Sequence, residues 1–446
     1  MWPIRITALL ALCLVQTFAQ APAVPKVTAV KCGRLLDVKS GNLIRDAVIL
    51  VEGGRIVNVG SRLPVPAGAL VIDLGAATVL PGLIDAHTHL LANYDGALGG
   101  DDENMILTVT QLDMARRALL GAAMARETLD AGVTTVRDLG NSGVGGDVAL
   151  RDAVRAGWVV GPRIVASTRA LAPAGGQFGR LSAEAQRLIE QEYVPVSGPE
   201  EARRAVRQAL YDGADCIKVV VDVGPRVLAP DEMGAIVAES RRAGRKVAAH
   251  VAGEEAARVA AAAGVDSIEH GYGLPDDVLA VMAAKRIFLV PTIQPADFYV
   301  NVFGKSYGAH IGEYEAGAKR ATQAKQETLA RALKAGVRIA AGSDLYYQVP
   351  GRTRGQAGLA VVRSYAAAGM SPLEIIRAAT AGAAELLGTR EKIGVVEPDA
   401  AADLVAFDGD PLSDINELER ARFVMKGGRV IRNEIEPRSP LRVLTR

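Results

Sequence analysis

Short apolar runs alternate with amphipathic stretches through the middle of the chain. The apolar runs have the length of buried parallel strands, and the stretches between them repeat apolar residues at helical spacing. The runs are Leu83–His87, Thr134–Asp138, Arg163–Ser167, Cys216–Val221, Val247–Val251, Ser267–His270, Phe288–Ile293 and Arg338–Ser343. The helical stretches include Gln111–Ala131, Glu200–Asp212, Asp231–Ala243, Glu254–Ala263 and Gly317–Ala335, and Ser371-Pro372-Leu373-Glu374 supplies the capping box of a last helix.

This succession of β–α units predicts an α/β fold. Eight units in sequence favour a closed (β/α)8 barrel of the TIM type, which we place at residues 81–389. The alternative is a doubly wound open sheet. No Gly-x-Gly-x-x-Gly turn follows the first strand to support that alternative.

Both ends of the chain have the pattern of short strands. Gly53-Gly54 lies between the apolar runs 47–51 and 55–59, and Gly427-Gly428 lies between 422–425 and 429–431, which are hairpin signals. A further strand is expected at 402–407. Neither end is long enough to close a sheet alone, so we predict one small β-sandwich domain built from residues 20–80 and 390–446.

The first nineteen residues have the features of a secretory signal peptide. Arg5 precedes an apolar run from Ile6 to Val15, and Thr17-Phe18-Ala19 supplies small residues at the two positions that a signal peptidase reads. The run is too short to span a bilayer. We therefore expect residues 1–19 to be removed and the protein to be exported to the periplasm or the medium.

Composition narrows the range of partners. Lys and Arg number 51 against 50 for Asp and Glu, and aromatic residues make up only 4%, so neither charge nor stacking favours a nucleic acid. We expect a small-molecule substrate, no nucleic acid and no membrane attachment after signal removal, and we leave a homo-oligomer open. After signal removal only Cys32 and Cys216 remain, which is a poor disulfide framework.

Four of the five histidines fall at the ends of predicted central strands. His87 and His89 are two residues apart and therefore face the same side of a strand. His250 and His270 end the fifth and sixth strands. One such histidine is most often a hydrogen-bonded core residue, but four at the carboxyl-terminal face of a barrel indicate a metal centre.

Lys218 and Asp344 end the fourth and eighth strands at the same face. The simple interpretation of Lys218 is a cation at the rim that pairs with a carboxylate. An ammonium among four imidazoles is, however, a poor neighbour for a metal ion. A desolvated lysine has a lowered pKa, and its neutral amine can add carbon dioxide to become an anionic carbamate able to bridge two metal ions.

These residues resemble the hallmarks of the amidohydrolase superfamily, and the resemblance covers nearly all of the chain after the signal. They are the segment Pro81–His89, Lys218, His250, His270, Asp344 and the final run Asp403–Leu412. Within this superfamily, the amino-acid sequence is most similar to the imidazolonepropionase-like and Xaa-Arg or Xaa-Pro dipeptidase-like branch. That resemblance implies two divalent ions, zinc by the donor set, with His87, His89 and Asp344 at one ion, His250 and His270 at the other, and carboxylated Lys218 as the bridge.

The resemblance implies a hydrolase that acts on C–N bonds. A pair of divalent ions would lower the pKa of a shared water toward about 7, and Asp344 would move the proton to the leaving amine. We therefore expect an exported enzyme that hydrolyses a dipeptide or an N-acyl amino acid. A lactonase or phosphotriesterase and a non-catalytic metal-binding protein remain the alternatives.

Other residues receive weaker assignments. Asp85 is either a partner of the metal ligands or a buried carboxylate that fixes a local turn, and Glu269 is expected to point away from the cavity. His310 lies in a loop without a metal role. Relatives differ from this chain at Gln177 and in the loop 221–226, which leaves the substrate open. Arginines that follow strands, and two tyrosines after Asp344, are candidates for substrate contact: Arg169, Arg226, Arg352, Arg354, Tyr346 and Tyr347.

Overall fold

The computed structural model of the protein describes residues 27–435. The predicted signal peptide, residues 1–19, lies outside the described residues. No helix in the described part of the chain is long and apolar enough to cross a membrane.

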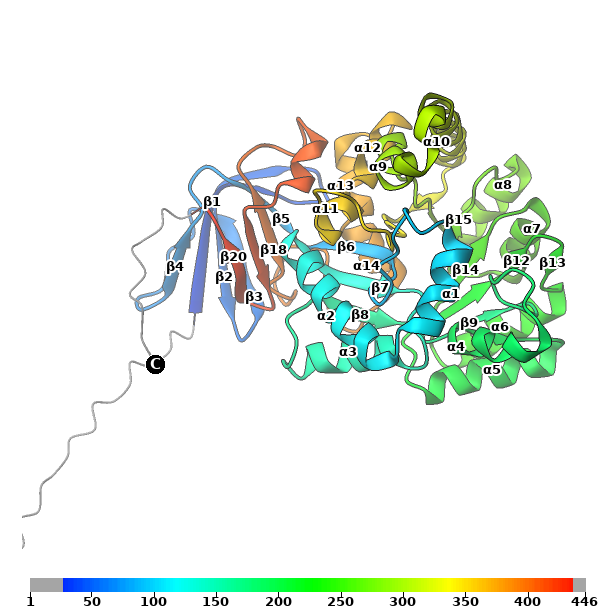
Figure 1. Cartoon of the computed structure of the whole chain (residues 1–446). Helices are drawn as coiled ribbons and strands as arrows, with labels where there is room; N and C mark the ends of the chain where they lie inside the picture. The colour runs from blue at the N-terminus through cyan, green and yellow to red at the C-terminus, as the bar shows by residue number, and fades with distance from the viewer. Residues whose placement is uncertain (1–26, 436–446) are drawn as a thin grey trace, which may run out of the picture.

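One mixed sheet joins strands from both ends of the chain, and Figure 1 shows it beside the α/β part of the molecule. The strand order is β20-β19-β18-β5-β1-β2-β3, and β4 pairs with β1. The antiparallel pair β5–β18 connects the two ends. The bounds are β1 Val27–Leu36, β2 Leu43–Glu52, β3 Arg55–Ser61, β4 Leu70–Asp73, β5 Thr78–Pro81, β18 Leu404–Phe407, β19 Phe423–Lys426 and β20 Arg429–Asn433.

Both predicted hairpins are confirmed. β2 pairs antiparallel with β3, and β19 with β20. Gly53 and Gly54 adopt φ of +56° and +80°, and Gly427 and Gly428 adopt +53° and +76°. Two successive left-handed residues match the right-handed twist of the flanking strands, and glycine adopts that conformation without steric cost.

The central strands are parallel, and apart from β10, which lies outside β9, they follow one another in sequence order. One run is β6-β7-β8 and the other is β10-β9-β11-β14-β15-β16-β17. A doubly wound sheet reverses its strand order in the middle, and no such reversal occurs from β11 to β17. The bounds are β6 Leu83–Thr88, β7 Val133–Asp138, β8 Arg163–Ala166, β9 Ala170–Ala172, β10 Tyr193–Pro195, β11 Ile217–Val220, β14 Val247–Val251, β15 Ser267–His270, β16 Phe288–Val290 and β17 Arg338–Ile339, with a hairpin of β12 Asp222–Val223 and β13 Arg226–Val227.

The last predicted strand is shorter than expected. β17 ends at Ile339, but the chain beyond it continues alongside β6. The amide of Ala86 donates to the carbonyl of Ala341 at 2.8 Å, and the amide of Asp344 donates to the carbonyl of His87 at 2.8 Å. Gly342 permits this approach because a Cβ there would lie 2.8 Å from the Cβ of His87.

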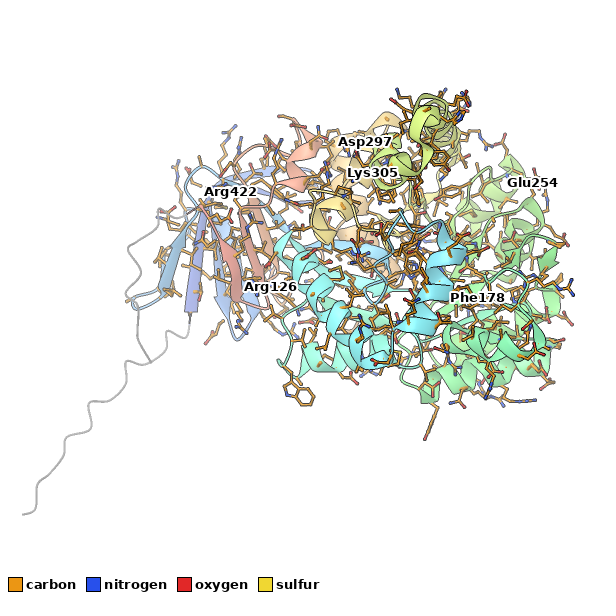
Figure 2. The ribbon with its side chains drawn as sticks, viewed as in Figure 1. Arg126, Phe178, Glu254, Asp297, Lys305 and Arg422 are labelled. Carbon is orange, nitrogen blue, oxygen red and sulfur yellow. The ribbon has the colours of Figure 1, made fainter. Side chains whose placement is uncertain are left out.

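Helices cover the parallel strands, and apolar residues of both layers form one buried cluster. Figure 2 shows the side chains on the ribbon. The predicted helices are present with shifted ends, and the predicted capping box is confirmed because Glu374 Oε2 accepts from the amide of Ser371 at 2.7 Å. The bounds are α1 Asp101–Gln111, α2 Met114–Asp130, α3 Gly146–Arg155, α4 Ile189–Glu192, α5 Pro199–Tyr211, α6 Pro230–Arg242, α7 Glu254–Ala263, α8 Asp276–Lys285, α9 Ala296–Tyr307, α10 Ile311–Lys334, α11 Arg354–Leu359, α12 Val361–Ala367, α13 Pro372–Ala378 and α14 Ala381–Leu387.

Candidate metal centre

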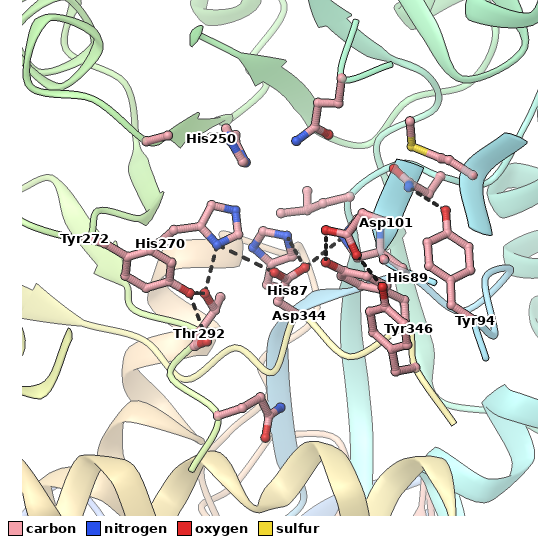
Figure 3. Close-up of a pocket in the computed structure, with 18 of the residues that line it drawn as sticks. His87, His89, Tyr94, Asp101, His250, His270, Tyr272, Thr292, Asp344 and Tyr346 are labelled. Carbon is pink, nitrogen blue, oxygen red and sulfur yellow. Dashed lines mark hydrogen bonds and ion pairs between the residues drawn. The ribbon is translucent and has the colours of Figure 1, made fainter. Parts of the chain in front are cut away.

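The carboxyl ends of the parallel strands open into a cavity of about 650 Å³. Six side chains that the sequence singles out all line this cavity, although they come from five separate segments of the chain: His87, His89, Lys218, His250, His270 and Asp344. Figure 3 shows the four imidazoles and the carboxylate of Asp344 grouped at its centre.

His87 and His89 each have one ring nitrogen fixed by an acceptor. Nδ1 of His87 lies 2.8 Å from Oε2 of Glu269, and Nδ1 of His89 lies 2.8 Å from the carbonyl oxygen of Gly140. A carboxylate and a carbonyl both accept, so each Nδ1 carries the hydrogen. The lone pair of each Nε2 is left for another partner.

Those Nε2 atoms face an oxygen that also accepts. Oδ1 of Asp344 lies 3.1 Å from Nε2 of His89 and 3.4 Å from Nε2 of His87. Three acceptors this close repel one another unless a positive charge lies among them. A proton or a metal ion can supply that charge, and buried histidines paired in this way are typical of metal ligands.

His270 and His250 occupy the neighbouring side of the cavity. Nδ1 of His270 lies 2.8 Å from Oγ1 of Thr292 and 3.6 Å from Oδ2 of Asp344. The ring of His250 lies 4.5 Å from the ring of His270. Burial and the charge of Lys218 lower the pKa of His250 to about 3, and burial lowers the pKa of His270 well below its ordinary value. Both rings are therefore neutral at pH 7, as metal coordination requires.

Lys218 lies directly beside the imidazoles. Its Nζ is 3.4 Å from Nε2 of His87, and the residue is 4% exposed. Burial lowers the pKa of Lys218 to about 8, although the carboxylates of Glu269 and Asp344 favour the ammonium. A neutral amine is thus accessible near physiological pH, which is the form that reacts as a nucleophile.

Asp344 stays ionised in this setting. Burial opposes its charge, but His87, His89 and Lys218 together hold the pKa of Asp344 below its usual value. Its backbone adopts φ of +51°, and His270 and Thr292 adopt +65° and +48°. Left-handed backbone at residues other than glycine costs of order 1–3 kcal/mol each and is typical of functional sites.

Glu269 does not line the cavity, as expected, but it contacts the candidate ligand His87 from behind, which the sequence did not predict. Its carboxylate is fully buried and lies between His87 and Arg137, with Oε1 2.8 Å from Nη2 of Arg137. Strand alternation should send Glu269 and His270 to opposite sides. The left-handed backbone of His270 breaks that alternation, so both side chains reach the interior.

Asp85 serves the local backbone. Its Oδ1 accepts from the amide of Ser343 at 2.9 Å and from the amide of His87 at 3.1 Å. It thereby ties the segment before Asp344 to the segment before His87. Of its two predicted roles, the structure supports the turn-fixing one.

The arginines do not contact the cavity. Among the residues between 27 and 435 that line it, none is Arg169, Arg226, Arg352 or Arg354. Arg352 pairs with Glu419 at 2.8 Å, and the other three donate to backbone carbonyls. Of the two interpretations of these arginines, a clamp for a substrate carboxylate or ordinary structural residues, the contacts favour the second.

Of the remaining candidate residues, three line the cavity and His310 does not. Gln177, Tyr346 and Tyr347 line the cavity, and Gln177 Oε1 accepts from the hydroxyl of Tyr193 at 2.9 Å. His310 is exposed, and its nearest carboxylate is that of Glu313 at 3.8 Å.

Sequence reasoning missed several lining residues. Thr292 and Tyr272 follow strands, so a search of every strand end could have found them. Lys325 and Tyr299 lie on α10 and α9, far from any strand end, and no spacing pointed to them.

The donor set and the buried partners behind it fit a divalent ion. His87, His270 and Asp344 each offer a ligand atom, and these atoms lie within 4.8 Å of one another. Imidazole nitrogen with carboxylate oxygen is a set that suits zinc and similar ions.

Comparison with known proteins agrees with this geometry. The model of the Amidohydrolase family matches residues 78–431. Ochratoxinase of Aspergillus niger is 30% identical over 440 residues, covering 91% of this chain and 87% of its own. Imidazolonepropionase of Deinococcus deserti (strain DSM 17065 / CIP 109153 / LMG 22923 / VCD115) is 26% identical over 402 residues, covering 83% and 87%.

Among solved structures, a Xaa-Pro dipeptidase with bound methionine in the active site superimposes with a TM-score of 0.77. It is 29% identical to this chain, and the match covers 91% of this chain and 99% of that one. The family model spans most of the sequence and includes every residue that lines the cavity, together with strands β5, β18 and β19 of the terminal sheet. The chain therefore belongs to the amidohydrolase family.

Proposed function

We propose that the protein is a binuclear metal-dependent amidohydrolase that hydrolyses the amide bond of a dipeptide or an N-acyl amino acid. The observation that carries this proposal is that Nε2 of His87 and Nε2 of His89 both lie within 3.4 Å of Oδ1 of Asp344, beside a buried lysine. Family membership supports amide hydrolysis. The named relatives, an ochratoxinase, an imidazolonepropionase and a Xaa-Pro dipeptidase, support action on C–N bonds.

Two divalent ions, zinc by the donor types, would be held by the six residues of the centre. His87, His89 and Asp344 would hold one ion, and His250 and His270 the other. Carboxylated Lys218 would contribute to both. The amine nitrogen of Lys218 adds to the carbon of carbon dioxide and loses a proton to water, which leaves an anion where an ammonium would oppose cation binding.

When bound, such ions supply a water of lowered pKa and polarise the scissile carbonyl. Asp344 accepts the proton of the attacking water, because its carboxylate is ionised and lies among the imidazoles. It then passes the proton to the departing amine nitrogen. Glu269 and the carbonyl of Gly140 keep His87 and His89 in the tautomer with Nε2 free.

Two further proposals concern the setting of this chemistry. We propose that the central strands close into a (β/α)8 barrel, supported by the hydrogen bonds from Ala86 to Ala341 and from Asp344 to His87, and by the one from Asp215 to Ala166. We also propose that the enzyme works outside the cytoplasm, which is supported by the composition of residues 1–19.

The test is a hydrolysis screen on metal-reconstituted protein. The panel holds dipeptides, N-acyl amino acids, lactones and phosphotriesters, and Asp344→Asn serves as the inactive control. Turnover of amides that disappears in Asp344→Asn supports the proposal. Turnover of esters alone, or of none of these compounds, contradicts it.

A further inference from the structure

The ammonium of Lys325 lies in the wall of the cavity between two tyrosine rings. Its Nζ is 4.1 Å from the centre of the Tyr272 ring and 5.3 Å from that of Tyr299, and it donates to the hydroxyl of Tyr299 at 3.1 Å. Lys325 comes from α10, outside the strand ends that supply the metal centre.

This cation is incompletely paired. A lysine ammonium has three N–H donors, and the hydroxyl of Tyr299 takes one. Aromatic faces stabilise the charge without replacing a charged acceptor. Across residues 27–435, no carboxylate lies within ion-pair distance of Lys325, although the more distant charge of Asp344 favours its ammonium and opposes the lowering of its pKa by burial. A half-buried ammonium with donors directed at a cavity is a site for an anionic group of a ligand.

The position of Lys325 relative to the metal centre suits one particular anion. The ring of Tyr272 lies 5.8 Å from the ring of His270, and Lys325 covers that same tyrosine ring. One aromatic ring therefore separates the ammonium from the ligands. In a dipeptide or N-acyl amino acid, the carboxylate is attached to the carbon next to the scissile nitrogen, so it would lie near the wall of this cavity when the amide is at the metal centre.

The opposite side of the cavity repels a carboxylate. Figure 3 shows Tyr272 and Asp101 on opposite sides of the imidazoles. Asp101 accepts from the hydroxyl of Tyr347 at 2.6 Å and from that of Tyr346 at 3.2 Å. A substrate carboxylate placed there would meet a like charge. The cavity thus has one cationic and one anionic side, with the reacting centre between them.

We propose that Lys325 is the specificity-determining residue that binds the free carboxylate of the leaving amino acid. The enzyme accordingly selects substrates with a carboxylate next to the scissile amide and orients them with the leaving group toward Tyr272. This proposal rests on the proposed amide hydrolysis.

The experiment compares N-acetyl-L-methionine with N-acetyl-L-methioninamide, which differ only in the negative charge. Wild-type holoenzyme should prefer the carboxylate. In Lys325→Met, kcat/KM for N-acetyl-L-methionine should fall roughly 10- to 100-fold, the worth of one charge-assisted hydrogen bond, with the amide within about three-fold of wild type. Lys325→Arg should keep the preference. Lys305→Met on α9, an exposed lysine labelled in Figure 2, is the matched control and should behave as wild type.

Calorimetry separates this proposal from the proposed function. L-methionine should bind the wild-type holoenzyme at least 10-fold more tightly than it binds Lys325→Met, and L-methioninamide should show no such difference. Equal losses for both ligands, or no loss in either assay, would overturn the role of Lys325. If no amide is hydrolysed but the methionine result holds, the proposed reaction fails and the carboxylate site stands.

Discussion

Replacing Glu269 by Gln tests the buried charges behind the metal centre. The carboxylate accepts from His87 through Oε2 and from Arg137 through Oε1, and both partners are buried. A glutamine offers one acceptor and one donor at the same places. If its oxygen faces His87, its NH₂ group faces the donating Nη2 of Arg137. If it flips, the NH₂ group faces Nδ1 of His87 and forces the tautomer with a hydrogen on Nε2.

Each of the two orientations of the glutamine amide lowers either the stability of the protein or its affinity for metal. The first leaves a buried guanidinium without its counter-charge, and breaking such a pair typically costs about 3–5 kcal/mol of stability. Arg137 keeps its bond to the carbonyl of Ala86 at 2.6 Å, so the lower end of that range is expected. The second removes a metal ligand, and loss of a partner of this kind typically reduces metal affinity about 10- to 100-fold.

Urea unfolding of the metal-free protein and competition with a chelator measure the two quantities. Glu269→Gln should lose about 3 kcal/mol of unfolding free energy, or at least 10-fold in metal affinity, or part of each. Glu315→Gln removes an exposed ion pair to Lys319 and should change stability by less than about 0.5 kcal/mol. If Glu269→Gln matched the control in both assays, the proposed function of this charge pair would be refuted.

Three other predictions concern Asp344, Lys218 and the two buried cysteines. Asp344→Asn should retain metal by elemental analysis while kcat falls roughly 10²- to 10⁴-fold, because an amide cannot accept the proton; turnover within a few-fold of wild type would assign the base elsewhere. The pKa of Lys218 is about 8 in the folded protein, below its ordinary 10.5, so the unfolded chain binds the proton more tightly. Relative to Lys218→Met, the unfolding free energy of metal-free wild type should therefore rise by about 3 kcal/mol between pH 8 and 10.5. If urea unfolding gave the same pH dependence for both proteins, this prediction would be contradicted. Burial raises the pKa of Cys32 and of Cys216 to about 12, so neither thiol should react with a disulfide reagent at pH 8 until the protein unfolds. After unfolding, a chain from which the signal peptide has been removed should show two reactive thiols, because Cys13 is lost, and the full-length chain should show three.

Local pattern was sufficient for most of the fold. The hairpins at Gly53-Gly54 and Gly427-Gly428 and the capping box at Ser371 each depend on a few adjacent residues, so the sequence alone predicts them. The end of the last central strand depends on more distant contacts. Residues 340–345 follow the backbone of β6 because Gly342 lets the two segments approach, and no pattern of apolar residues encodes that contact.

The candidate ligands were predictable for a similar reason. In parallel β–α units the strand ends gather at one face, so histidines at several strand ends must meet there. Glu269 and Lys325 were not predictable. The first reaches the interior only because His270 leaves the strand conformation, and the second depends on how α10 lies over Tyr272.

Removal of metal provides the last test of the centre. The protein holds Nε2 of His87, Nε2 of His89 and Oδ1 of Asp344 close together, with left-handed backbone at Asp344 and His270. The clustered acceptors are unfavourable without a cation and the left-handed backbone is strained in itself, so the energy that maintains both must come from the rest of the fold. An ion at 100 times its dissociation constant adds about 2.7 kcal/mol to the folded state. Dialysis against a chelator should therefore lower the melting temperature by several degrees, and zinc should restore it. Asp344→Ala should show a smaller shift, because one of the three converging ligands is gone. Equal melting temperatures with and without metal in wild type would mean that these acceptors do not bind a cation.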